Sequence, residues 1–195
     1  MKLLMTSWLV LLFLSACSAS KPTLFHTLGS VNAAIQPDLA LSKRIPSLGV
    51  GPIKLPSLLD REGLVLRRSD FTLNISDKHQ WGGQLKDEFT IALTQHLQRR
   101  LPKTHIRAIP WELEQTPLYQ VVVNVSRFDA MPAKVASLQG DWRIEQAKDG
   151  KIVSTGLFDL ERPVKGEAIS LMVQAQSLLL SDLADQLIAQ LASIP

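Results

Sequence analysis

The sequence predicts a single α/β domain of the α+β kind, in which a mostly antiparallel mixed sheet carries two long helices packed on it. Several runs of residues alternate between apolar and polar side chains, as half-buried strands do. Two longer segments place apolar residues at three- and four-residue steps, which is the spacing of an amphipathic helix. Asp149-Gly150, between two of the alternating runs, is a strong signal for a tight hairpin turn.

The first part of the domain predicts strands joined by turns and loops. Residues 23–28 alternate and predict a first strand, whereas residues 29–43, which include a Pro-Asp pair, predict a loop. Residues 45–55 predict an extended strand with a kinked end, because prolines fall within it.

The glycines of residues 49–56 invite comparison with a phosphate-binding loop, because glycine exposes backbone N–H groups to anions. The segment lacks the Gly-Lys-Ser/Thr ending of such loops. In addition, Pro52 removes one donor and Pro56 blocks the helix that should follow. An extended strand is therefore the preferred interpretation.

Residues 63–68 and 71–76 predict a β-hairpin, because both alternate and a short polar connection separates them. Arg67 and Arg68 end the first of these strands. We interpret them as a solvated strand end rather than as a site for lipid phosphates.

The first long helix is predicted over residues 84–101, and Pro102 stops it. Its apolar stripe consists of Leu85, Phe89, Ala92 or Leu93, His96 or Leu97, and Leu101. Because His96 lies on or near this stripe, we expect a residue at the edge of the core rather than a ligand. Asp87 and Glu88 are expected on a helix face that is exposed to water.

The centre of the sheet is predicted in the second half of the domain. After a short strand at residues 106–109, residues 119–129 carry the strongest strand signal in the chain. Their β-branched centre predicts a central strand covered on both faces. Residues 134–147 and 151–160 flank the Asp-Gly turn, so three consecutive antiparallel strands are expected.

The second long helix is predicted over residues 168–192. One continuous stripe runs along it through Met172, Ala175, Leu179, Leu183, Leu187 and Leu191. Further apolar residues widen this stripe beyond a single face, so the helix should lie deep against the sheet or have a second partner. We hypothesise that part of it faces another subunit.

The beginning of the chain is typical of a secretory signal. Lys2 is followed by an apolar segment at residues 3–14, which is too short for a finished bilayer span of about 20 apolar residues. Residues 14–17, Leu-Ser-Ala-Cys, resemble a bacterial lipobox. The resemblance implies cleavage before Cys17 and acylation of its sulfur and new amino group. Ser18, in place of the aspartate that retains lipoproteins at the inner membrane, implies sorting to the outer membrane.

Cys17 is the only cysteine in the chain. A lone exported thiol has no disulfide partner in an oxidising compartment, which favours acylation over an ordinary signal peptide or an uncleaved anchor. The expected organisation is a signal peptide at residues 1–16, an acylated cysteine and tether at residues 17–22, and one domain at residues 23–195.

Charge and motif content argue against several functions. The formal net charge is only +3, so we expect no nucleic-acid partner. His26, His79, His96 and His105 are scattered along the chain, and neither a Gly-x-Ser-x-Gly elbow nor a metal-spaced histidine pair is present. We therefore expect no catalytic residue, no metal site and no cofactor.

Several short motifs occur in a characteristic order over nearly the whole chain. They are the lipobox, Phe25-His26-Thr27-Leu28, residues 49–56 with Leu59-Asp60-Arg61, Trp81, Pro110-Trp111, Tyr119-Gln120-Val121, Phe128-Asp129 and Trp142. In this order and spacing the chain resembles the auxiliary lipoproteins of ABC-type transport systems, in particular the PqiC-like lipoproteins of paraquat-inducible MCE transport systems.

The resemblance implies a non-catalytic outer-membrane lipoprotein that docks the periplasmic tube of an MCE-type intermembrane lipid transport system and supports membrane integrity. The implied partners are a periplasmic MCE-domain protein (PqiB-like) and further copies of the chain in a homo-oligomeric ring, which would cover exposed sheet edges. The one site residue carried over is Cys17, the point of lipidation. Two alternatives remain open: a lipoprotein that plugs or chaperones an outer-membrane β-barrel, and an auxiliary subunit of a different MCE operon.

Overall fold

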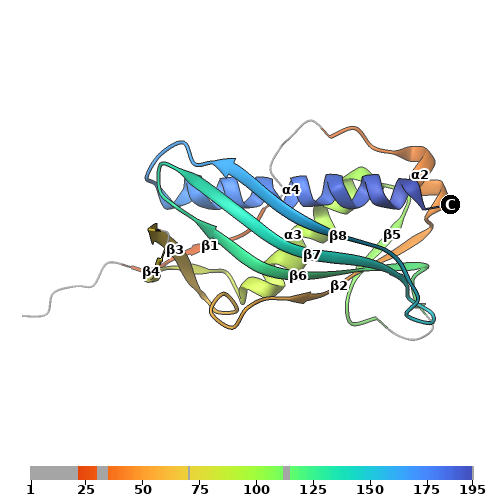
Figure 1. Ribbon diagram of the computed structural model, residues 1–195, viewed down its shortest axis with the longest axis horizontal. Coiled ribbons are helices and arrows are strands. Elements are labelled where there is room, and N and C mark those ends of the chain that lie inside the picture. Colours follow the sequence, from red (N-terminus) through yellow and green to blue (C-terminus); the bar gives the residue numbers. More distant parts are fainter. Residues whose placement is uncertain (1–21, 30–34, 70, 112–114, 195) are drawn as a thin grey trace, which may run out of the picture.

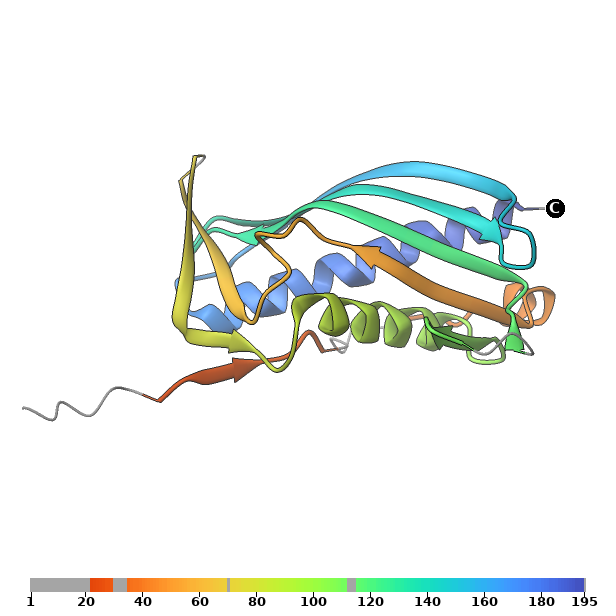
Figure 2. The same cartoon turned by 90° about the horizontal axis from the view of Figure 1, so that it is seen from below.

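The structure, a computed structural model, describes residues 22–29, 35–69, 71–111 and 115–194 of the 195-residue chain. The predicted signal peptide, Cys17 and most of the predicted tether lie outside these residues. Within them, an eight-stranded mixed sheet carries two long helices on one face (Figures 1 and 2). The predicted α+β fold with a mixed sheet and two long helices is confirmed.

Three long antiparallel strands form one side of the sheet, as the sequence predicts. They are β6 (Tyr119–Ala130), β7 (Val135–Gln146) and β8 (Ile152–Pro163). Gly150 in the β7–β8 turn has a φ of +71°, a conformation that glycine adopts at little cost. Among the described residues β8 pairs only with β7, so its other edge is open.

Parallel strands extend the sheet on the other side of β6. Strand β2 (Ser47–Lys54) pairs with β6, and β5 (His105–Ala108) pairs with β2. The extended strand expected over this glycine-rich segment is therefore confirmed. The glycine at position 49 makes room for a tryptophan, because a Cβ on Gly49 would lie 2.7 Å from Cη2 of Trp111.

The remaining strands form a hairpin that is joined to the sheet at one point. Strands β3 (Gly63–Ser69) and β4 (Thr72–Trp81) are antiparallel, which confirms the predicted hairpin. Strand β3 meets β6 only at the parallel pair of Leu66 and Ala130, and β1 (Leu24–His26) adds to the far side of β4. Figure 2 shows the hairpin standing away from the main layer.

Both predicted long helices are present. Helix α3 (Leu85–Arg100) and helix α4 (Ile169–Ser193) lie side by side on the same face of the sheet (Figure 1). Helix α4 contacts β6, β7 and β8 on one side and α3 on the other. These contacts within the chain account for the breadth of its apolar stripe, which suggested a second partner in the sequence.

The loop predicted over residues 29–43 is wrong at its C-terminal end, where α2 (Leu39–Arg44) forms. The carboxylate of Asp38 accepts a hydrogen bond of 2.8 Å from the Leu41 N–H, which makes the predicted turn residue an N-cap. A helix of six residues is too short for its apolar spacing to stand out in the sequence.

The core lies between the helices and the sheet, with β6 at its centre. Val121, Val122 and Val123 are all fully buried although successive side chains of a strand point to opposite faces. This confirms the prediction that the strand is covered on both faces.

Gly140 marks a close approach of β7 to β6. A Cβ at this position would lie 2.1 Å from the Asn124 carbonyl oxygen and 2.6 Å from Cζ of Phe158. The register between the two strands shifts next to this point, between Val125 and Arg127. Backbone on one side and a core ring on the other leave no room for a side chain.

We predict that Gly140→Ala destabilises the domain by about 3 kcal/mol, because the added methyl group must displace backbone or the Phe158 ring. Gly83→Ala is the matched control, since a Cβ there meets no atom within 4 Å. Urea titrations monitored by circular dichroism measure the free energy of unfolding of both variants. Equal stability of the two variants would contradict the prediction.

Candidate functional site

The expected lipidation residue, Cys17, lies outside the described residues, and the described domain begins five residues later at Pro22. The segment that follows is held firmly. Strand β1 pairs with the end of β4, and the Leu28 N–H donates a hydrogen bond of 3.0 Å to Oε2 of Glu88 at the start of α3. Glu88 is half-buried and accepts a hydrogen bond from the segment that follows β1. The prediction that Glu88 is exposed to water is therefore wrong.

Two histidines meet where β1 joins β4. Nε2 of His26 lies 3.0 Å from Nδ1 of His79, although 53 positions separate the residues. Burial lowers the pKa of His26, and the neighbouring His79 lowers it further. The contact between the two rings helps to hold β1 on β4 near the predicted tether. The pair could not be predicted, because nothing in the sequence indicates which strand β1 joins.

A buried carboxylate joins the hairpin to the centre of the sheet. Asp129 of β6 accepts hydrogen bonds from Nε of Arg67 at 2.8 Å and from Nη2 of the same arginine at 2.7 Å. Nε of Arg127 donates to it at 3.0 Å. Burial raises the pKa of Asp129, but the hydrogen bonds from Arg67 and Arg127 outweigh burial and lower the pKa overall. The predicted solvated end is thus wrong for Arg67, which is ion-paired, whereas Arg68 is exposed.

Polar side chains also cross the seam between the two long helices. Arg100 of α3 donates to Oδ1 of Asp185 at 2.6 Å and to the Ser181 carbonyl oxygen at 3.0 Å, both on α4. His96, one turn before Arg100, is fully buried, so it lies inside the core rather than at the edge expected for it. Its burial, followed by the charges of Arg100 and Arg99, lowers its pKa from 6.5 to about 4, whereas Asp185 opposes the shift.

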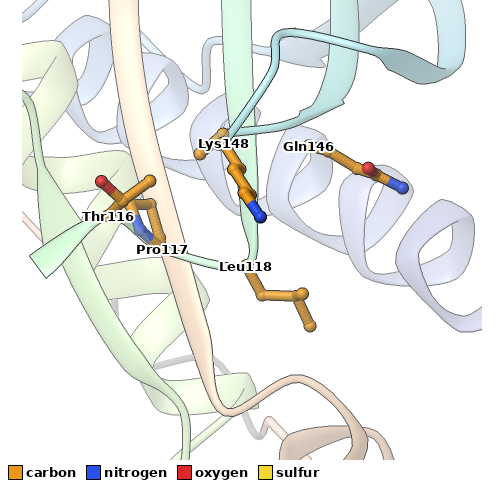
Figure 3. Close-up of a pocket in the computed structure, with 6 residues that line it drawn as sticks. Thr116, Pro117, Leu118, Gln146 and Lys148 are labelled. Atoms are coloured by element: carbon orange, nitrogen blue, oxygen red, sulfur yellow. The ribbon is translucent and has the colours of Figure 1, made fainter.

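A surface hollow lies at the opposite end of the domain from the β3–β4 hairpin. It has a volume of about 440 Å³ and is lined by Thr116, Pro117, Leu118, Gln146, Ala147 and Lys148. Figure 3 shows the Lys148 side chain over the segment that leads into β6, with Gln146 pointing away. Among its lining residues, Lys148 is the one with a titratable side chain.

Two further observations concern metals and membranes. Among the described residues, no group of three or more His, Cys, Asp or Glu side chains is placed to hold a metal ion. None of the helices in the described part of the chain is both long and apolar enough to cross a bilayer.

Comparisons with known proteins identify relatives of the chain. A family model described as ABC-type transport auxiliary lipoprotein component matches residues 26–188. The crystal structure of an uncharacterized protein is similar over 87% of this chain and 99% of that chain, at 18% identity and a TM-score of 0.70. A protein from Xanthomonas campestris is similar over 87% of this chain and 91% of that chain, at 16% identity and a TM-score of 0.64. These two structures show the fold, and no curated protein matches the chain.

We predict that the domain loses stability as the pH falls from 6.5 towards 4. The folded state lowers the pKa of His96 to about 4, so in this range the unfolded chain binds the proton more tightly and each proton favours unfolding. The loss reaches about 3 kcal/mol below pH 4, since one pKa unit corresponds to about 1.4 kcal/mol. His96→Leu should remove much of this slope, whereas His105→Gln, at an exposed position, should keep it. The test is to measure the free energy of unfolding of the unmodified protein and of both variants across this pH range. If the free energy falls with pH at the same slope in all three proteins, the prediction is wrong.

Proposed function

The chain belongs to the family of ABC-type transport auxiliary lipoprotein components, and from that premise we propose that it is the outer-membrane lipoprotein subunit of an MCE-type intermembrane lipid transport system. The observation that carries the proposal is the position of the family match. It begins nine residues after Cys17, the last residue of the lipobox. This spacing supports the proposal, because a lipid anchor at Cys17 would be joined to the transport-auxiliary domain by only a short tether.

In this proposal the acyl chains of Cys17 hold the domain permanently at the periplasmic face of the outer membrane. A single acyl chain gives marginal membrane binding, and each buried methylene group adds about 0.8 kcal/mol, so several chains on one cysteine make dissociation negligible. The tether limits how far the domain can move away. Leu24 lies seven positions after Cys17, and seven extended residues span at most about 25 Å.

The domain then serves as the docking subunit for the tip of a periplasmic MCE-domain protein, without a catalytic role. Further copies of the chain surround the tip in a ring. The open edge of β8 supports such an assembly, because a long unpaired strand edge is a template for pairing with another chain.

The test is a pull-down of the full-length protein from membranes in mild detergent, with mass spectrometry of its amino terminus and of the proteins that accompany it. We expect an acylated Cys17 and a periplasmic MCE-domain protein. The matched control replaces residues 1–17 with an ordinary cleavable secretion signal, and this variant should appear in the soluble periplasmic fraction. An unmodified amino terminus would contradict the anchor, and capture of a β-barrel protein instead would favour the chaperone or plug.

We further predict that the detergent-solubilised protein forms a homo-oligomer and that Leu157→Lys on β8 lowers the oligomer fraction at least about tenfold, because a charge in a packed contact loses its hydration. Leu157 is exposed in the single chain, so the substitution should not change the unfolding free energy. Ile91→Lys, at an exposed position of α3, is the matched control. Native mass spectrometry measures the oligomer, and a monomer at every concentration would contradict the ring.

A further inference from the structure

Exposed apolar side chains gather at the end of the domain where the chain enters it. Phe71, at the turn of the β3–β4 hairpin, is 100% exposed. In β1, Phe25 is 68% exposed and Leu24 is 53% exposed, and Ile75 of β4 is also exposed. We call these four residues the apolar end. Single exposed apolar residues are ordinary on a protein surface, so their common location is what needs an explanation.

The four residues belong to the hairpin and to the strand beside it. Strand β1 pairs with residues 79–81, at the C-terminal end of β4, whereas Ile75 lies further along β4 towards the turn that carries Phe71. Both views show the hairpin and the start of β1 at one end of the molecule, opposite the β7–β8 turn (Figures 1 and 2). The aromatic and aliphatic side chains of the apolar end therefore face outward at the end from which the predicted tether leaves.

The hairpin is fixed in its projecting position. Arg67 of β3 donates two hydrogen bonds to the buried carboxylate of Asp129 on β6. The side chains of Arg68 and Lys78, also on the hairpin, are exposed to solvent. Asp77, beside Lys78, is exposed as well, so two exposed cations and one exposed anion accompany the apolar side chain at the turn. Apolar groups with exposed cations near them suit a membrane interface, which buries apolar groups and offers phosphate headgroups.

We propose that the apolar end contacts the lipid leaflet to which Cys17 is anchored, with Phe71 inserted into the boundary between headgroups and acyl chains. This inference rests on the proposed lipid anchor. With at most about 25 Å of tether between Cys17 and Leu24, the apolar end is the part of the domain that the anchor keeps next to the leaflet. The occupant of this surface is therefore lipid rather than a protein partner, and the contact orients the rest of the domain towards the periplasm.

The experiment places a fluorescent probe at Phe71. In the full-length protein with Phe71→Cys, the acylated Cys17 is blocked, so a thiol-reactive, environment-sensitive dye labels the new cysteine alone. The labelled protein is reconstituted into vesicles of phosphatidylethanolamine with a minor fraction of phosphatidylglycerol, with and without lipids that carry a quencher on the acyl chain near the headgroup. Ile152→Cys, whose native side chain is 53% exposed beside the β7–β8 turn at the opposite end, is the matched control.

We expect the quencher lipids to reduce the emission at position 71 about twofold and to leave position 152 unchanged, because interfacial apolar groups enter the bilayer by about 5–10 Å. Phe71 is fully exposed, so labelling it should leave the melting temperature unchanged.

The inference is wrong if lipid quenchers do not reduce the emission at position 71 in protein that is acylated and floats with the vesicles. That result would leave the proposed lipid anchor unaffected. A probe at 71 shielded from aqueous iodide but not quenched by lipid would show a protein partner there and would also overturn the inference. A chain that carries no acyl group and does not float would overturn the anchor itself, and the inference with it.

Discussion

The ion pairs of Asp129 are the interaction on which the arrangement of the domain depends. Strand β3 shares only one backbone pair with β6, so the hairpin would be loosely attached without side-chain contacts. A buried carboxylate is costly unless it is paired, and Asp129 is paired with Arg67 from the hairpin and with Arg127 from its own strand. Removing Arg67 would weaken the attachment of the hairpin, which the buried Leu64 and Leu66 also hold, and would leave the carboxylate with one arginine fewer. The position of β3, β4 and β1 relative to the main layer is therefore coupled to the centre of the sheet.

The elements that could be predicted from the sequence are those specified by neighbouring residues. The order β6–β7–β8 follows from alternation on either side of the Asp149-Gly150 turn, and the two long helices follow from apolar residues at helical spacing. The lipidation of Cys17 also rests on a contiguous motif, the lipobox, and it stays a prediction because the residue lies outside the described part of the chain. In each case the information lies within a window of some twenty residues or fewer, which is the range over which periodicity is informative.

The elements that could not be predicted depend on contacts between distant segments. Nothing in residues 23–28 indicates that they join β4, so the pairing of His26 with His79 was not foreseen. Glu88 and Arg67 were assigned to solvent because a charged residue is exposed unless it has a partner, and both partners lie about sixty positions away along the chain. The exposure of a charged residue therefore cannot be predicted from its neighbours in the sequence, because its partner can be a residue that only the fold brings close.

Ion pairs between arginines and carboxylates occur in several parts of this domain. Five of the 21 lysine and arginine side chains form ion pairs with carboxylates within the described part of the chain. They are Arg67, Arg100, Arg127, Arg143 and Arg162. The helices cover one face of the sheet. The free edge of β8 and the end of the domain that carries the hairpin and β1 are exposed. In the proposed function the subunit assembles along this edge and rests on a membrane at this end, so the two surfaces together would hold it between a leaflet and a protein partner.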